Sequence, residues 1–345
     1  MDINLKNKET IIEFFKELNH CDKDSLEKVL SHYLIETSRV EISKPFSEYI
    51  GVHKYKEQFF EPLLRAFPDV EIQPYIVMSG ASGDNNCVCV AGNFIGTFVN
   101  DWLTIPANQQ PVTIRFHATF FLDNDKIIRS WYFFDILDVI RQSGYQLFPF
   151  KGLQQTAPNP MPGNGIITYP TDFKESEISY NLTNAMIAGL LEYDGKSIES
   201  MGQERFWDQK NMMWYGPGGI GTTRGLKGFQ DNHQIPFLKA FPNRGVCEEN
   251  ESTNFVNIAE GNYTCHFGYP IMYGNHTGDG WLGLKASNKS FTIRVMDFWR
   301  REDNKLKENW VMIDMIDLLE QFDINVFQLL KKEINDDKSR TDKNG

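Results

Sequence analysis

The chain repeats itself, and this repeat constrains its fold more than any other feature. Residues 51–69 align without a gap with residues 225–243, and the Gly, Pro, Leu and Ala-Phe-Pro positions coincide. Residues 113–142 align with residues 292–321 with eight identities over 30 positions, where average residue usage gives about two by chance. We therefore interpret the chain as a tandem duplication of one domain.

The repeat divides the 345 residues into two domains. Prolines and glycines crowd residues 151–175, which cannot continue a helix or a sheet ladder, so this segment is predicted to be a linker. We expect a divergent copy over residues 1–150 and a second copy over residues 176–333. Residues 334–345 are polar and charged without an apolar period, and they are predicted to form a disordered tail.

Composition limits the compartment and the partners. A net charge of −11 without any basic run argues against a nucleic acid or an anionic membrane as partner. There is no apolar run of 18 residues and no signal-peptide core, and the five dispersed cysteines form no Cys-x-x-Cys pair. We expect a soluble cytoplasmic protein with reduced thiols.

Apolar periodicity predicts the same elements in each copy. An amphipathic helix opens the copy, and a second helical stretch ends before Pro68 or Pro242, since proline disfavours helix at the residue before it. Residues 291–299 and 306–314 read as two long strands joined by a turn at residues 302–305, which would place Asp297 opposite Trp310. Helices followed by a strand meander predict an α+β domain, with a curved antiparallel sheet wrapped over helices and a cone-shaped pocket between them.

Several segments of copy two resemble the SnoaL-like polyketide cyclase family, of the nuclear transport factor 2-like superfamily. They are WYGPGGIGTTRG (214–225), HQIPFLKAFPN (233–243), HTGDGWLG (276–283), RVMDFWRRED (294–303) and ENWVMID (308–314). Copy one is similar through PFSEYIG (45–51), PLLRAFPD (62–69) and WYFFDILDVIRQSG (131–144). The resemblance implies the cone-shaped, cystatin-like α+β fold. It leaves the function open, because the superfamily includes cyclases, isomerases, hydrolases, dehydratases and binding domains.

Asp314 is the first candidate for catalysis. The Trp-x-x-x-Asp spacing puts it on the strand face of Trp310 and Met312, where an apolar setting raises a carboxyl pKa as a general acid/base requires. The resemblance implies the same role, since the aspartate of this motif is the acid/base of an aldol closure in SnoaL-like cyclases. The alternative is that Asp314 caps the following helix.

Asp297 and His233 are the other catalytic candidates. Asp297 interrupts an apolar strand face, where it would either share acid and base roles with Asp314 or pair with an arginine. His233 lies in a helical stretch, and His266 and His276 are more typical of structural histidines. The residues expected to line the substrate pocket are Trp214, Tyr215, Trp299, Trp310, Met312 and His276.

Copy one offers a second candidate site at Asp135, with Trp131 and His117. Because copy one lacks the glycine-rich segment and has Phe59 where copy two has His233, we expect it to be structural.

No cofactor and no catalytic metal are expected. Gly216-x-Gly218-x-x-Gly221 fits a dinucleotide fingerprint, but no acidic residue stands about twenty positions further on and no βαβ pattern surrounds it. We interpret this segment as a tight loop over the pocket mouth. The sequence shows no paired histidines at metal-binding spacing.

The sequence thus favours a cofactor-independent enzyme that performs acid/base chemistry, either aldol-type cyclisation or isomerisation, on a small or medium apolar carbonyl compound. Two alternatives stay open: an epoxide-hydrolase-like enzyme in which Asp297 and Asp314 activate water, and a non-catalytic small-molecule-binding protein. The copies are expected to pair as a pseudo-dimer within the chain, and a homodimer is also compatible with the repeat.

Overall fold

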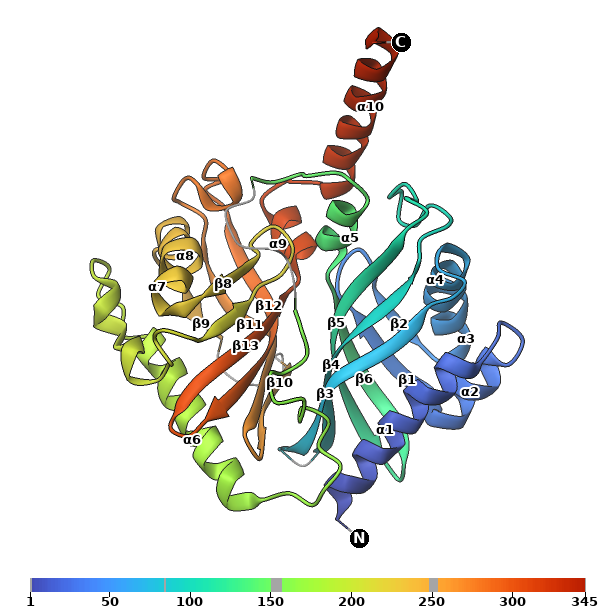
Figure 1. The fold of residues 1–345 in the computed structure, drawn as a ribbon, viewed down its shortest axis with the longest axis horizontal. Helices are drawn as coiled ribbons and strands as arrows, with labels where there is room; N and C mark the ends of the chain where they lie inside the picture. The colour runs from blue at the N-terminus through green and yellow to red at the C-terminus, as the bar shows by residue number, and fades with distance from the viewer. Residues whose placement is uncertain (1, 84, 150–156, 248–253, 345) are drawn as a thin grey trace.

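The protein folds into two α+β domains whose sheets face each other (Figure 1). The computed structural model describes residues 2–83, 85–149, 157–247 and 254–344. Each sheet is curved without closing into a barrel, and helices cover its outer face (Figure 1). This confirms the predicted fold class.

Domain one builds its sheet in the order β2-β1-β6-β5-β4-β3. Its elements are α1 (Ile3–His20), α2 (Leu26–Tyr33), β1 (Leu34–Ile42), β2 (Glu48–Ile50), α3 (Val52–Tyr55), the π-helix η1 (Lys56–Phe60), α4 (Glu61–Ala66), β3 (Glu71–Ser82), β4 (Asn85–Thr97), β5 (Pro111–Asp123), β6 (Lys126–Phe134) and α5 (Ile136–Gln142). β1 pairs with β6 in parallel, and the other neighbours pair antiparallel. The helix α4 ends two residues before Pro68, as predicted.

Domain two repeats this topology in the order β10-β11-β12-β13-β7-β8, with β9 paired to β11. Its elements are α6 (Phe173–Leu190), η2 (Ile198–Met201), η3 (Gln203–Arg205), β7 (Met213–Tyr215), β8 (Thr222–Arg224), α7 (Gly225–Phe229), the π-helix η4 (Gln230–Gln234), α8 (Ile235–Ala240), β9 (Gly245–Val246), β10 (Asn254–Glu260), β11 (Tyr263–Asn275), η5 (Trp281–Gly283), β12 (Ser290–Glu302), β13 (Lys305–Ile313) and α9 (Met315–Gln321). The predicted hairpin corresponds to β12 and β13.

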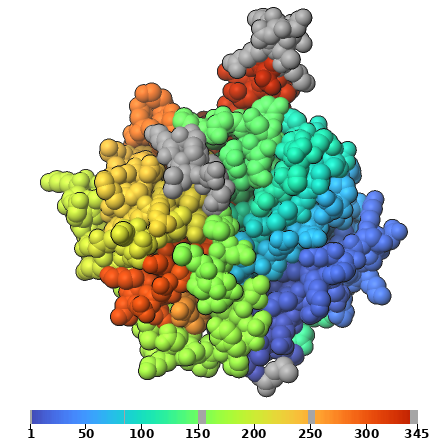
Figure 2. All heavy atoms as spheres, in the orientation of Figure 1, coloured from blue at the N-terminus to red at the C-terminus, as the bar shows by residue number. Residues whose placement is uncertain are grey.

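The segment that joins the domains runs over the seam between them (Figure 2). Within it, Ile166 forms a parallel bridge with Val77, and the carbonyl of Pro158 accepts a hydrogen bond from Trp310 Nε1 at 2.9 Å. Residues 151–156 of the predicted linker lie outside the described residues, so the linker and domain boundaries stay a prediction.

The C-terminal segment differs from the sequence expectation. The helix α10 (Val326–Asn344) continues through residues for which the sequence predicts disorder. This segment continues the helix begun by the apolar residues from Val326 onward, and the absence of an apolar period in its last turns therefore did not exclude a helix here. No helix in the described part of the chain is long and apolar enough to cross a membrane.

The two domains bury a common interface between the inner faces of their sheets. Its apolar side chains include Tyr75, Met78, Cys87, Cys89, Trp131 and Phe133 from domain one and Tyr215, Val256, Tyr263, Cys265, Phe267, Met296, Phe298, Trp310 and Met312 from domain two. Lys8 and Glu260 form a buried ion pair across the interface, and the Glu260 carboxylate also accepts from the Ser79 amide at 2.7 Å. The tandem copies therefore pair within one chain.

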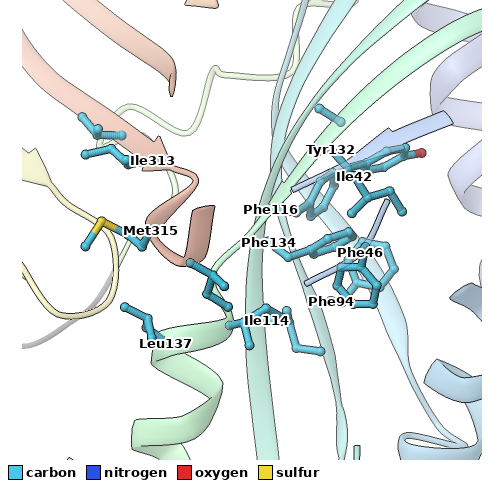
Figure 3. Close-up of a cluster of buried hydrophobic side chains, with 14 of the residues drawn as sticks. Ile42, Phe46, Phe94, Ile114, Phe116, Tyr132, Phe134, Leu137, Ile313 and Met315 are labelled. Atoms are coloured by element: carbon cyan, nitrogen blue, oxygen red, sulfur yellow. The ribbon is translucent and has the colours of Figure 1, made fainter. Parts of the chain in front are cut away.

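Domain one fills the space between its sheet and its helices with aromatic rings (Figure 3). The rings of Tyr132 and Phe134 stack with centroids 5.8 Å apart, and Phe116 lies 6.2 Å from Phe134. The equivalent positions of domain two hold the smaller residues Val295, Val311 and Ile313. This difference in side-chain volume leaves room for a cavity in domain two.

Candidate functional site

Domain two encloses an apolar cavity of about 210 Å³ between its sheet and its helices. Most of the lining is aliphatic or aromatic, with contributions from α6, α8, β11, β12 and β13. The polar side chains that reach it are Gln203, His233, Gln234, Arg244, His266, Asp297 and Asn309. An apolar cavity with a few converging polar groups is the usual form of a small-molecule site.

Asp297 is the carboxyl group of this cavity. It lies on β12, where Oδ1 has no hydrogen-bond partner in the described part of the chain, and the Asn309 side chain is hydrogen-bonded to the carboxyl group. Burial raises the pKa of Asp297 well above its ordinary value, because a charge in this apolar space would lose its hydration. Burial therefore favours the protonated form of this carboxyl group.

His266 stands directly beside Asp297. The two residues are register partners on β11 and β12, and directly opposed side chains on one face have Cβ atoms about 5 Å apart. Burial lowers the pKa of His266 to about 4. At neutral pH the imidazole is uncharged, and it adjoins a carboxyl group whose protonated form burial favours.

His233 reaches the cavity from the π-helix η4. Its ring stacks on Trp214 with centroids 4.2 Å apart, and burial lowers its pKa to about 3. Domain one has the same π-helical turn, η1, with Phe59 at the equivalent position. The turn therefore belongs to the fold, and the histidine belongs to the cavity of domain two.

Four buried polar atoms of the lining have no hydrogen-bond partner within the described residues. They are Asp297 Oδ1, His233 Nδ1, Gln234 Oε1 and Trp299 Nε1. Buried polar atoms are nearly always paired, because an unpaired one costs about 1–3 kcal/mol. These four atoms are available for hydrogen bonds to a bound molecule or to water.

The predicted register of the hairpin is wrong by one residue. Asp297 pairs with Val311 instead of Trp310, because a β-bulge at Arg300 and Arg301 shifts the two strands past each other. Because side chains alternate along β13, Asn309, Val311 and Ile313 face the cavity. Trp310 and Met312 face the domain interface. Trp299 does line the cavity, as expected.

Asp314 lies outside the cavity, at the domain interface. Its carboxylate caps α9 by accepting from the Asp317 amide at 3.2 Å, and it accepts from the Lys44 amide of domain one, also at 3.2 Å. Arg294 Nη1 lies 3.4 Å from the same carboxylate. Burial, with Asp317 nearby, raises the pKa of Asp314 to about 7. The structure therefore favours the capping interpretation.

Tyr215 and His276 do not line the cavity either. Tyr215 faces the domain interface, and its hydroxyl donates to Glu308 at 3.2 Å. His276 Nδ1 lies 3.2 Å from Ser287 Oγ, and its ring packs 4.4 Å from the ring of Phe322. Both residues pack within the structure and leave the cavity to Trp214 and Trp299.

The second candidate site in domain one is also an interface feature. Asp135 caps α5 and accepts from the amide of Gly218 in domain two at 2.9 and 3.0 Å. A Cβ atom on Gly218 would lie 2.6 Å from Asp135 Oδ1, so the loop requires glycine there. This glycine-rich loop covers Asp135, and its Gly219 and Ile220 also line a small pocket together with His233. Trp131 belongs to the interface cluster, and His117 Nδ1 lies 2.9 Å from the Met296 carbonyl oxygen.

The sequence analysis missed His266, Asn309 and Arg244. Comparing the two copies would have singled out these positions, because domain one has Val90, Ser130 and Val70 where domain two has His266, Asn309 and Arg244. Within the described residues, no group of three His, Cys, Asp or Glu side chains is placed to hold a metal ion.

Comparisons with known proteins agree with the observed fold. The family model of SnoaL-like polyketide cyclases matches residues 9–143 and 204–322. A SnoaL-like polyketide cyclase from Jannaschia sp. CCS1 is 23% identical, covers 42% of this chain and 97% of its own, and has a TM-score of 0.36. One from Agrobacterium tumefaciens strain C58 is 22% identical, with 40% and 98% covered and a TM-score of 0.32.

SalBIII, described as an epoxide hydrolase/cyclase-like enzyme in pyran ring formation of the polyether salinomycin, is 23% identical, with 39% and 93% covered and a TM-score of 0.31. No curated protein matches the chain. The family assignment rests on the family model, whose two matches span most of the chain. The protein belongs to the SnoaL-like polyketide cyclase family and carries two copies of its domain in tandem.

Proposed function

We propose that domain two is a cofactor-independent enzyme that enolises a small apolar carbonyl compound, leading to aldol-type cyclisation or isomerisation. One observation carries the proposal: Asp297 and His266 stand side by side on the wall of an apolar cavity. Burial favours the protonated form of Asp297 and the unprotonated form of His266, so one group can donate a proton and the other has a vacant nitrogen to receive one.

The chemistry follows from this pair. Asp297 donates its proton to the carbonyl oxygen while His266 removes the proton from the adjacent carbon, which converts the ketone into its enol. The carboxylate and the imidazolium form together and stabilise each other in the cavity. Return of the proton to a different carbon completes an isomerisation, and attack of the enol carbon on a second carbonyl closes a ring.

The other polar and aromatic groups position the substrate. The stacked rings of His233 and Trp214 form a flat wall that suits an unsaturated or aromatic ring. A cavity of about 210 Å³ restricts the substrate to a small molecule. Hydrolysis by Asp297 and Asp314 together has less support, because Asp297 lines the cavity and Asp314 lies outside it.

Hydrogen–deuterium exchange tests the proposal without knowledge of the natural substrate. The protein is incubated in D₂O with 4-phenyl-2-butanone or 1-indanone, and exchange at the carbon next to the carbonyl is followed by proton NMR. The intact protein should accelerate exchange over buffer, and Asp297→Asn should lose about 10²- to 10⁴-fold of that acceleration, the usual contribution of a general acid/base.

Asp314→Asn is the matched control. Asparagine also caps helices, and Asp314 does not face the cavity, so this variant should keep the exchange activity. Loss of exchange in Asp314→Asn with full activity in Asp297→Asn would transfer the role to Asp314. If both ketones bind but neither exchanges faster than in buffer, domain two is a binding domain and the proposed reaction fails.

A further inference from the structure

Arg244 is a cation that the proposed reaction does not use. Its side chain lines the cavity of domain two, and it is the one lysine or arginine to do so among the described residues. Its polar contacts are weak: Nη2 donates to the Leu190 carbonyl at 3.4 Å, and the guanidinium lies 5.6 Å from the centre of the Tyr193 ring. The described residues supply it with no carboxylate within salt-bridge distance.

Among the described residues, a half-buried arginine without a neighbouring carboxylate is unusual. Other buried or half-buried arginines lie beside carboxylates, as Arg115 does at Asp135 and Arg300 at Glu308. Burial lowers the pKa of Arg244, since the apolar lining removes water from the guanidinium without supplying a counter-ion. The guanidinium thus has hydrogen-bond donors and a charge to offer to whatever fills the cavity.

Arg244 lies at the open end of the cavity. Two lining residues near it, Leu191 and Val246, are 61% and 37% exposed. Arg244 precedes the strand β9, whose Val246 pairs with Met272 of β11. Asp297 of β12 pairs with His266, which lies nearer the start of β11. Arg244 and Asp297 therefore contact different parts of a bound molecule.

We infer that the substrate carries, besides its carbonyl group, an anionic group of the carboxylate class that pairs with Arg244. This inference rests on the proposed function, because it concerns the substrate of the same cavity. A carboxylate presents two oxygens to a guanidinium in matching geometry. Among the described residues Arg244 is the one lysine or arginine of the lining, so it offers a bound anion a positive partner despite the net charge of −11.

Domain one supports this assignment. Alignment of the repeat places Val70 at the position of Arg244, in the domain whose interior is filled with aromatic rings. The arginine therefore accompanies the cavity and is not a general requirement of the fold. It acts as a specificity residue that selects and orients the substrate.

A pair of probes that differ in charge alone tests the inference. Affinities of the intact protein for 4-oxo-4-phenylbutanoate and for its neutral amide, 4-oxo-4-phenylbutanamide, are measured by calorimetry at pH 7.5. The carboxylate should bind at least tenfold more tightly. Arg244→Met should abolish this preference, Arg244→Lys should retain part of it, and Arg224→Met, an exposed arginine of β8 away from the cavity, should leave it unchanged.

Equal affinity for the two probes, no binding of either, or an unchanged preference in Arg244→Met overturns the inference. Asp297→Asn separates this outcome from failure of the proposed reaction, because it should keep the carboxylate preference while losing hydrogen–deuterium exchange. A carboxylate preference in a protein that never catalyses exchange would leave the anion site standing and refute the reaction.

Discussion

Filling the cavity of domain two should stabilise the protein and remove its ligand binding. Val295→Phe introduces the residue that domain one carries at Phe116. The two positions are equivalent because each pairs with the last residue of the next strand, Ile313 of β13 or Phe134 of β6. At about 24 cal/mol per Å³ of cavity, complete filling of the cavity of about 210 Å³ corresponds to about 5 kcal/mol. A phenyl ring in place of the valine side chain fills roughly a quarter of that space and should add about 1 kcal/mol.

The assay combines unfolding with binding. Thermal unfolding followed by circular dichroism should show a melting temperature about 2–4 °C higher, and calorimetry with 4-phenyl-2-butanone should show no binding. The matched control is Phe116→Val, which should cost about 2–3 kcal/mol by opening a void in domain one and leave ligand binding intact. If Val295→Phe destabilises the protein and the ketone still binds, position 295 does not face a ligand-sized space and the account of the cavity is wrong.

Other perturbations test the interface and the protonation states. Glu260→Gln leaves Lys8 buried without its partner and should cost about 3–5 kcal/mol in urea unfolding; a change below 1 kcal/mol would contradict a buried pair. Gly218→Ala drives a Cβ atom to 2.6 Å from Asp135 Oδ1 and should lower the melting temperature without weakening ketone binding, so weaker binding would contradict a purely structural loop. The pKa of His266 is about 4 in the folded protein and about 6.5 in the unfolded chain. As the pH falls, the unfolded chain therefore takes up the proton first. The free energy of unfolding should fall by up to about 1.4 kcal/mol per pH unit from pH 6.5 down to pH 4. His266→Gln should remove this slope, and a wild-type-minus-variant difference that is constant over that range would show that His266 is not buried in the neutral form.

The repeat made the fold predictable because the identities it preserves are structural. The Thr292 amide donates to Gln321 Oε1 at 2.8 Å, and Gln321 Nε2 returns a hydrogen bond to the Thr292 carbonyl at 3.0 Å. Thr113 and Gln142 form the same pair of bonds in domain one. These residues tie the start of a long strand to the helix that follows the hairpin, and both copies need that junction.

The same identities include Asp135 and Asp314, the aspartates that the sequence offered as catalytic candidates in the two copies. Asp135 and Asp314 are shared by the copies because each caps a helix and accepts a hydrogen bond from a backbone amide of the opposite domain. The cavity residues occupy positions where the copies differ: Asp297 and His266 align with Ala118 and Val90. In this duplicated chain, differences between the copies mark the candidate site and identities mark the scaffold.

The side-chain directions in β13 could not be read from the sequence. The alternation of apolar residues predicts a strand, but a single bulge at Arg300 and Arg301 decides which residues of β12 and β13 stand opposite each other. Both faces of β13 are buried, one against the cavity and the other against domain one, so hydrophobicity does not distinguish them. The position of Trp310 therefore depended on tertiary contacts with the opposite domain.

A crystal structure of the protein with bound 4-phenyl-2-butanone tests the central claim most directly. The account predicts the ketone in the cavity of domain two, with its oxygen within hydrogen-bonding distance of the Asp297 carboxyl group and its adjacent carbon facing His266. Density for the ketone at the domain seam beside Asp314 or Asp135, with the cavity of domain two unoccupied, would contradict it.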